Sequence, residues 1–327
     1  DFPKIVTLHT VHFERDETPS GLCSTQYLFL KNLLPSVDAI TVFSRGAYLA
    51  VTTAFPQYRE KVFVLKHGIP SHSLISNISR QEARSRLHEY LVNESDLNVE
   101  SKKSLCRNGI LTDPDSFIIG ECGFLCPGKQ SELMYSVRDR LADKAPQRKV
   151  IALRIGAARN ADQVEYVAGL LQEADGVDKL LLQTCLPEEM LRLAQKAFDV
   201  NFYWPEFCTQ SGILAHALGA GAIVAGRDME GSGEMLKEAG AITTRELDAV
   251  VGELIHLMHH PERSAQIEKQ VLQYAEIYSW KNQAARHFEL GKVIAEKQMV
   301  KAGKAAPFAT RLHTLNRLYR EAGVKVA

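Results

Sequence analysis

The sequence predicts an α/β fold built on doubly wound parallel sheets. Short apolar runs rich in β-branched residues recur along the chain, and they are nearly continuous rather than alternating. Such runs are typical of strands that are buried on both faces. Helical patterns of ten or more residues separate most of the runs. Alternation of strands and helices at this spacing indicates βαβ units and therefore parallel sheets.

The elements follow one another in a regular order. We predict strands over residues 4–10, 39–44, 61–68, 117–125, 150–156, 179–185, 200–204 and 222–226. The clearest helices between them are residues 24–34, 130–141, 161–173 and 187–198. Near the C-terminus the helical patterns 246–260, 262–278 and 280–297 follow one another without strands between them. The chain should therefore end in helices.

The strand pattern stops between about residues 70 and 115, where the sequence is polar. We predict a partial N-terminal Rossmann-like domain over 1–75 and a linker with a polar helical insertion over 76–114. A C-terminal Rossmann-like domain should follow over 115–279, and a helical segment over 280–327. Three strands are few for a doubly wound domain, which usually has ~100–150 residues. The first domain is therefore either unusually small or lacks its front.

The amino-acid composition argues against some classes of function. The 327 residues include 39 basic and 39 acidic side chains, and this balance argues against nucleic-acid binding. The sequence shows no membrane-span pattern and no signal peptide, and its six cysteines are scattered as reduced thiols would be. We therefore expect a cytoplasmic protein. Beyond Met299 the chain is basic, which fits either a solvated helix or contact with the inner face of an anionic membrane.

The segment Gly120–Lys129 (GECGFLCPGK) is the most informative motif. An apolar strand ends in a Gly/Pro turn, and a lysine stands at the start of the next helix. In open α/β sheets ligands bind beyond the carboxyl ends of the strands, and a helix N-terminus attracts anions. The motif fits a phosphate site that includes Gly123 and Lys129, although an ordinary surface lysine after a turn has the same local pattern. We assign no metal to Cys122 and Cys126, because no second ligand pair follows at a suitable spacing.

A second anion site is predicted around Ser211 and Gly212, in the segment YWPEFCTQSGILAHALGAGAIVAG. Ser211 is a good N-cap for a short helix rich in small residues. Glu206 follows the end of a strand, where a carboxylate can accept hydrogen bonds from sugar hydroxyl groups. A solvated loop acid is the alternative.

Two histidines end strands of the first domain. His9, in LHTVH, could donate to a phosphate or hydroxyl group, or it could be a satisfied edge histidine. We give His67, in the turn KHG, less weight. The segment Gly231-Ser232-Gly233 lacks the full dinucleotide-binding spacing and is predicted as a turn before a helix.

The order of these motifs resembles the GT-B glycosyltransferases of family 4, from about Lys4 to about Ile294. The segments that match the family's motifs are LHT (8–10), VDAITVFS (37–44), VLKHGI (64–69), GFLCPGKQ (123–130), ALRIG (152–156) and EFCTQSGILAHALGAGAIVA (206–225). The helix YSWKNQAARHFEL resembles the closing helix of the family, which crosses back to the first domain. The family's front strands have no counterpart in this sequence.

The resemblance implies retaining transfer of a sugar from a nucleotide-sugar to an acceptor, which could be a glycan, a lipid or a protein. Lys129 matches the lysine that contacts the diphosphate, and His9 matches the first-domain histidine near the transferred sugar. Ser211 and Gly212 match the backbone that holds the distal phosphate. Glu206 is the best match to the first glutamate of the Glu-x7-Glu pair, one residue out of register. The resemblance implies no required metal and no cofactor.

Two departures from the family pattern keep a second hypothesis open. The arginine usual beside the diphosphate is Phe124 here, and the second glutamate of the pair falls on Ala215, next to His216. Loss of a ribose clamp would cost on the order of 1–3 kcal/mol of nucleotide-sugar binding. The alternative is therefore a non-catalytic GT-B-like subunit that binds a glycan, a protein or a glycosyltransferase partner.

Overall fold

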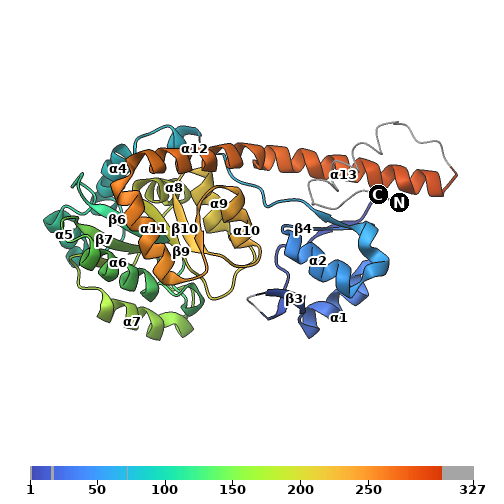
Figure 1. The fold of residues 1–327 in the computed structure, drawn as a ribbon, viewed down its shortest axis with the longest axis horizontal. Helices are drawn as coiled ribbons and strands as arrows, with labels where there is room; N and C mark the ends of the chain where they lie inside the picture. The colour runs from blue at the N-terminus through green and yellow to red at the C-terminus, as the bar shows by residue number, and fades with distance from the viewer. Residues whose placement is uncertain (1, 16–17, 72, 304–327) are drawn as a thin grey trace.

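The computed structural model describes residues 2–15, 18–71 and 73–303. The chain forms a smaller and a larger α/β region, and one long helix extends from the larger region along the smaller one (Figure 1). Most of the basic C-terminal segment, for which we predict a solvated helix or a membrane contact, lies outside the described residues. Among the helices that are described, none is both long and apolar enough to cross a membrane.

The smaller region is built on a three-stranded parallel sheet in the order β1-β4-β5. Its strands match the first three predicted strands. A short antiparallel hairpin, β2-β3, precedes the first helix and was not predicted. The elements of this region are β1 (Ile5–Thr7), β2 (Phe13–Arg15), β3 (Thr18–Leu22), α1 (Ser24–Leu33), β4 (Ala39–Val42), α2 (Arg45–Ala54) and β5 (Val62–Val64), with 3-10 turns η1 (Leu34–Ser36) and η2 (Pro56–Lys61).

Residues 76–114, for which we predict a linker and a polar helical insertion, form two helices that pack on the larger sheet. They are α4 (Arg80–Asn93) and α5 (Val99–Asn108), preceded by the short α3 (Ser73–Ser76). Leu87 and Leu91 of α4 are fully buried and share a core with residues of that sheet. The polar composition of these helices does not indicate that they pack on a sheet, because a few buried leucines are enough to hold a helix there.

The larger region is a six-stranded, all-parallel sheet in the order β11-β10-β9-β6-β7-β8. The chain builds outward from β6 to β8, then returns to the other side of β6 and continues to β11. The strand order therefore reverses between β6 and β9. Its strands are β6 (Phe117–Cys122), β7 (Val150–Ile155), β8 (Lys179–Leu182), β9 (Val200–Tyr203), β10 (Val224–Arg227) and β11 (Ile242–Thr244).

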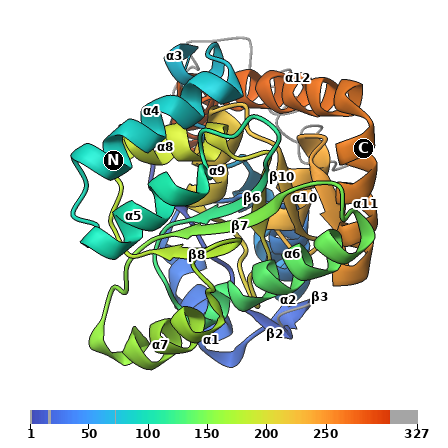
Figure 2. The same ribbon diagram turned by 90° about the vertical axis from the view of Figure 1, so that its left-hand side faces the viewer.

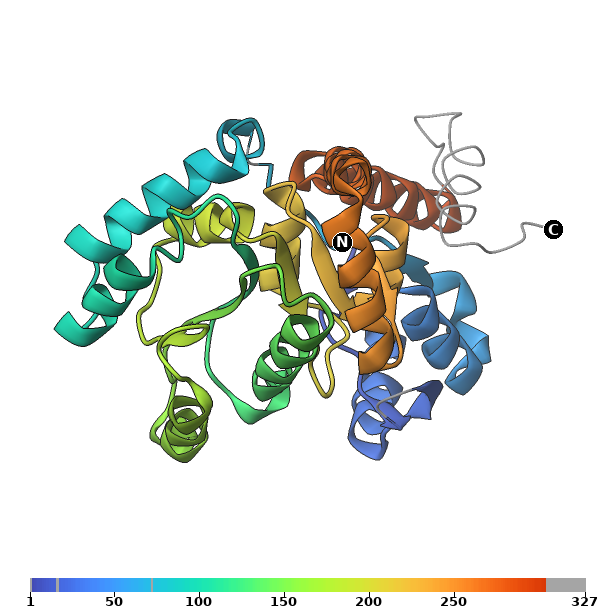
Figure 3. The ribbon, with the colours of Figure 1, turned by 60° about the vertical axis from the view of Figure 1, so that its left-hand side comes forward.

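Helices cover both faces of this sheet (Figures 2 and 3). Phe117 and Ile119 of β6 point into one apolar core, and Ile118 points into a second core on the opposite face. This alternation explains why the strands are continuous apolar runs in the sequence. The helices are α6 (Glu132–Lys144), α7 (Val164–Glu173), α8 (Glu188–Ala197), α9 (Gly212–Gly219), α10 (Ser232–Glu238), α11 (Leu247–His259) and α12 (Pro261–Ile277), with 3-10 turns η3 (Pro127–Lys129) and η4 (Ala161–Gln163).

The long helix α13 (Trp280–Lys301) crosses back over the smaller region (Figure 1). Leu290 and Ile294 of α13 share a small buried core with Phe63 and Leu65 of the smaller region. The chain segments are also joined through the backbone, since the Ile69 N–H donates to the Tyr278 carbonyl at 2.9 Å. α13 therefore supplies apolar cover for the three-stranded sheet.

Carboxylates of the larger region meet the N-terminus of α2. The Ser44 hydroxyl, which caps α2, donates to the Glu230 carboxylate. The Arg45 N–H donates to the Glu234 carboxylate at 3.0 Å. An ideal Cβ on Gly46 would lie 2.0 Å from a Glu230 carboxylate oxygen, so only glycine leaves room for this approach. A helix N-terminus attracts negative charge, and this attraction offsets part of the cost of burying these carboxylates.

Candidate functional site

A pocket of about 570 Å³ opens at the carboxyl ends of β6, β7 and β8, beside the start of α9. This position adjoins the reversal of strand order between β6 and β9, where open α/β sheets bind ligands. The residues that line the pocket are Gly123, Phe124, Lys129, Ile155, Gly156, Ala157, Thr184, Cys185, Leu186, Leu191, Gln210, Ser211, Gly212, Ile213 and His216.

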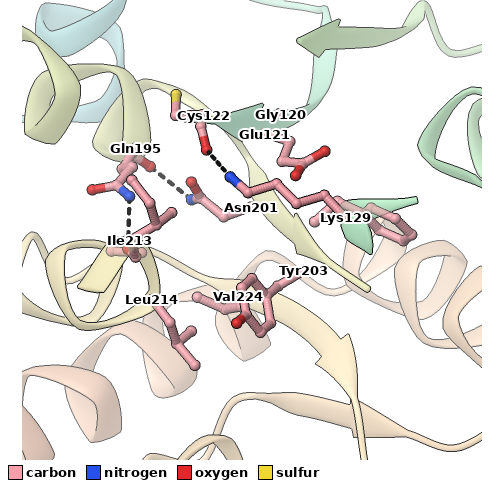
Figure 4. Close-up of a pocket in the computed structure, with 12 residues that line it drawn as sticks. Gly120, Glu121, Cys122, Lys129, Gln195, Asn201, Tyr203, Ile213, Leu214 and Val224 are labelled. Carbon is pink, nitrogen blue, oxygen red and sulfur yellow. Dashed lines mark hydrogen bonds between the residues drawn. The ribbon is translucent and has the colours of Figure 1, made fainter. Parts of the chain in front are cut away.

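Lys129 ends the 3-10 turn η3 and extends its side chain back toward the end of β6. Its Nζ lies 3.5 Å from the Cys122 carbonyl oxygen (Figure 4). Gly123 has φ of +108°, and an ideal Cβ there would lie 2.9 Å from the same Nζ. Glycine therefore provides both the turn and the space for the ammonium group. Burial lowers the pKa of Lys129, and the nearby Glu121 partly offsets this effect.

Helix α9 presents its N-terminus to the same pocket. Ser211 caps the helix, and its hydroxyl oxygen accepts from the Leu214 N–H at 3.4 Å. The next residue, Gly212, has open space where a side chain would be, so its backbone can be approached closely. Gly123 and Lys129 thus lie in one pocket with Ser211 and Gly212. A cationic side chain and a helix N-terminus together can hold an anion.

Glu206 lies beside this pocket rather than among its lining residues. It follows β9, and its side chain is exposed. Its N–H donates to the Gly128 carbonyl at 2.9 Å, and its own carbonyl accepts from Arg227 at 3.1 Å. The first bond joins the loop after β9 to the turn that carries Lys129, and the second joins it to the end of β10.

His9 lies in the smaller region, at the end of β1. Its exposed ring packs edge-to-face against Phe43 and His67, with ring centroids 5.6 and 5.5 Å apart. His67 is buried, its Nδ1 is 2.7 Å from the Gly68 carbonyl, and its ring also meets Trp280. Burial lowers the pKa of His67, and the electrostatic influence of His9 and His216 lowers it further. His9 and His67 thus lie in contact in the smaller region, and His216 of the larger region contributes to the lowered pKa of His67.

Ala215 stands where the resemblance implies a second glutamate. Ala215 is buried in the core, whereas its neighbour His216 lines the pocket. Burial lowers the pKa of His216, and Arg192 contributes. The Arg159 guanidinium lies over the Phe124 ring, 5.5 Å from its centroid. A positive charge is thus present at the side of the pocket where the sequence has Phe124.

A buried charged cluster that was not predicted lies beneath the pocket. Arg154 of β7 is fully buried and forms an ion pair with Glu121 of β6, with Nε 3.2 Å from the carboxylate. The Ser131 hydroxyl donates to the same carboxylate at 2.6 Å and accepts from Arg154 at 3.0 Å. An arginine within an otherwise apolar strand pattern was the available signal, because arginine is rarely buried without a partner.

The cysteines of the phosphate motif show no metal-site geometry. Cys122 is buried in the sheet, and burial raises the pKa of its thiol to about 12. Within residues 2–15, 18–71 and 73–303, no three histidine, cysteine or acidic side chains are grouped so that they could hold a metal ion.

No protein-family model and no curated protein sequence matches the chain. Solved structures do match it. Anabaena HepE, crystallised with UDP and glucose, has a TM-score of 0.56 and 17% identity over 88% of this chain and 71% of its own. A UDP-forming α,α-trehalose-phosphate synthase from Burkholderia xenovorans has a TM-score of 0.64 and 13% identity over 90% and 69%. Sucrose-phosphate synthase from Thermosynechococcus elongatus has a TM-score of 0.64 and 15% identity over 91% and 68%. The predicted α/β fold is therefore confirmed, and the chain has the GT-B fold with two Rossmann-like regions.

Proposed function

We propose that this protein is a retaining glycosyltransferase, similar to family 4, that moves a sugar from a nucleoside-diphosphate donor to an acceptor. The observation that carries the proposal is the single pocket shared by the Lys129 ammonium and the N-terminus of α9. Both attract the same kind of ligand, a phosphate-bearing anion. A diphosphate is large enough to engage both groups.

The similar folds support a nucleotide-sugar as the source of that diphosphate. HepE is described in complexes with UDP and with UDP-glucose, and the trehalose-phosphate synthase is described as UDP-forming. UDP-sugars are therefore the first substrates to test. The apolar part of the pocket, around Ile155 and Leu186, offers surface for the nucleoside.

In the proposed reaction an acceptor hydroxyl oxygen bonds to the anomeric carbon while the bond from that carbon to the diphosphate oxygen breaks. The acceptor proton passes to the departing diphosphate, on the same face of the sugar, so the configuration is retained. Lys129 and the amide groups near Ser211 stabilise the negative charge that develops on the leaving group. This arrangement requires no metal ion. His9 and Glu206 are the proposed contacts to the sugar.

The test is a screen of nucleotide-sugars by calorimetry and by hydrolysis, with Lys129→Met compared with the intact protein. We expect one donor to bind, and Lys129→Met to weaken that binding by about tenfold to a hundredfold, the worth of a charge-assisted hydrogen bond. Lys196→Met is the control, because Lys196 is a buried lysine of the same region that lies outside the pocket and pairs with Glu268 on α12. If no nucleotide-sugar is bound or hydrolysed, the proposal is wrong.

Ala215 and Phe124, at positions where the resemblance implies a glutamate and an arginine, favour one other candidate function. In that case the chain is a non-catalytic subunit that binds a glycan or a glycosyltransferase partner. Binding of a nucleotide-sugar without hydrolysis or transfer, together with co-purification of a second subunit, would support this candidate over the enzyme.

A further inference from the structure

Arg154 holds the loop that begins the candidate phosphate site. Besides Ser131, all of its hydrogen-bond partners are backbone carbonyl groups, and all five of its N–H groups are satisfied. The acceptors are the carbonyl oxygens of Ile155 at 2.7 Å, Phe124 at 2.9 Å, Gly123 at 3.0 Å and Glu121 at 3.1 Å. Three of these carbonyls, those of Gly123, Phe124 and Ile155, belong to residues that line the pocket, and the first two lie in the loop after β6.

The direction of these carbonyl groups fixes the direction of an amide. In a trans peptide the N–H points opposite to the preceding C=O. Since the Gly123 carbonyl points to the buried guanidinium, the Phe124 N–H points away from it. The neighbouring amides are already used, because Gly123 donates to Ile155 and Leu125 donates to Ala157 at 3.1 and 3.0 Å. Within the described part of the chain, the Phe124 N–H has no acceptor.

Only backbone separates the guanidinium from the pocket at this point. Gly156 lines the pocket, and an ideal Cβ there would lie 1.9 Å from the Gly123 carbonyl oxygen and 3.0 Å from Arg154 Nη1. Glycine at 156 thus lets β7 and the loop after β6 approach closely enough for Arg154 to reach the loop. Any side chain at this position would push the loop away.

We propose that Arg154 is a positioning residue for the diphosphate: it holds the Gly123 and Phe124 carbonyls on the core side, so that the Phe124 N–H faces the pocket beside Lys129 as a further phosphate donor. This inference rests on the proposed function. Arg154 acts mainly by fixing the direction of these carbonyl groups and not by attracting the diphosphate, because Glu121 pairs with its positive charge. A lysine at 154 would keep the charge but offers three donors from one atom instead of a planar fork.

The experiment compares Arg154→Lys with Arg84→Lys in the full chain. Arg84 is a matched control, because it is also buried in the larger region, donates to two backbone carbonyls and pairs with Asp199. Two quantities are measured: hydrogen exchange of peptides that cover residues 120–130, and the affinity for inorganic pyrophosphate and for UDP. Thermal unfolding shows that each variant is folded.

We expect Arg154→Lys to speed exchange in this loop and to weaken pyrophosphate and UDP binding by about tenfold or more, as for loss of an oriented donor to a charged ligand. Arg84→Lys should leave loop exchange and both affinities unchanged. Loop exchange in Arg154→Lys equal to that in Arg84→Lys would overturn the inference. If the unmodified protein binds neither ligand, the proposed function fails, and loop exchange alone still decides whether Arg154 positions the loop.

Should Arg154→Lys not fold, the pair Arg154→Met with Glu121→Gln removes both buried charges together, a change that proteins often tolerate. The same two measurements apply to this double variant. Wild-type loop exchange or wild-type affinity in the folded double variant would overturn the inference.

Discussion

The two sheets differ in which parts of the chain pack on their faces. The six-stranded sheet has helices of its own on both faces, and each face has an extensive core. The three-stranded sheet has α1 and α2 on one face, but its other face is covered by Leu290 and Ile294 of α13, which follows the larger region in sequence. The smaller region therefore depends on the C-terminal part of the described chain, whereas the larger one does not depend on α13 in the same way.

The first prediction tests the dependence of the smaller region on α13. Leu290→Ala should lower the free energy of unfolding by about 2–4 kcal/mol, because a fully buried leucine is removed from a small core. Hydrogen exchange should accelerate in peptides of β4 and β5 and stay unchanged in β6 and β7. Leu254→Ala on α11 is the control, since it removes the same atoms from a core of the larger region. Equal acceleration in both regions after Leu290→Ala would contradict the comparison.

The candidate site is divided in the same way. The groups that suit an anion, Lys129 and the N-terminus of α9, lie in the larger region, while His9 and His67 lie in the smaller one. Binding of the nucleotide and reaction of the sugar should therefore respond to different substitutions.

The second prediction tests this division. His9→Ala should leave UDP affinity within about twofold, because His9 is not among the residues that line the anion pocket and its ring packs on Phe43 and His67. It should lower sugar transfer by about a hundredfold, a usual loss when a polar group at the reacting centre is removed. Calorimetry and initial rates measure the two effects. Lys129→Met should mainly weaken the affinity for UDP. If His9→Ala weakened UDP affinity as much as Lys129→Met does, the site would not be divided.

Much of the larger region could be predicted from sequence because its signals are local. Continuous apolar runs marked the strands, and Gly123, Lys129 and Ser211 stood where strands end and helices begin. Two of the missed features depend on pairing between distant segments. Arg154 donates hydrogen bonds to carbonyl groups about thirty residues away in the sequence. Ser44 of the smaller region donates to Glu230 of the larger one. A single sequence gives the residue types but not these partners.

The polar helices α4 and α5 illustrate the same limit. Their composition suggested a linker with a polar helical insertion, but Leu87 and Leu91 are enough to bury α4 against the larger sheet. A helix needs only a narrow apolar stripe, so mean composition does not distinguish a covering helix from an exposed one. The smaller region was predicted less completely, because the hairpin β2-β3 leaves a weak local signal. The return of the C-terminal helix to this region was expected from the family resemblance and not from a local pattern.

The third prediction concerns the contact between the regions and has the smallest expected effect. Glu230 is half-buried against the capped N-terminus of α2, and burial raises its pKa, while the Ser44 hydroxyl opposes the rise. A carboxyl group whose folded-state pKa is raised stabilises the fold below its ordinary pKa, and this contribution is lost as the pH rises through the raised value. Glu230→Gln keeps a hydrogen-bond acceptor without the charge.

The variant should therefore gain stability relative to the unmodified protein between pH 4 and pH 7, by less than about 1 kcal/mol, because the carboxylate is only half-buried and solvent screens part of its charge. Thermal unfolding at several pH values measures the difference. Glu189→Gln, an exposed glutamate on α8, should show no such change. The prediction is contradicted if the stability of Glu230→Gln and that of the unmodified protein change with pH in the same way. The N-terminus of α2 would then fully compensate the carboxylate, and the contact between the two regions would not titrate.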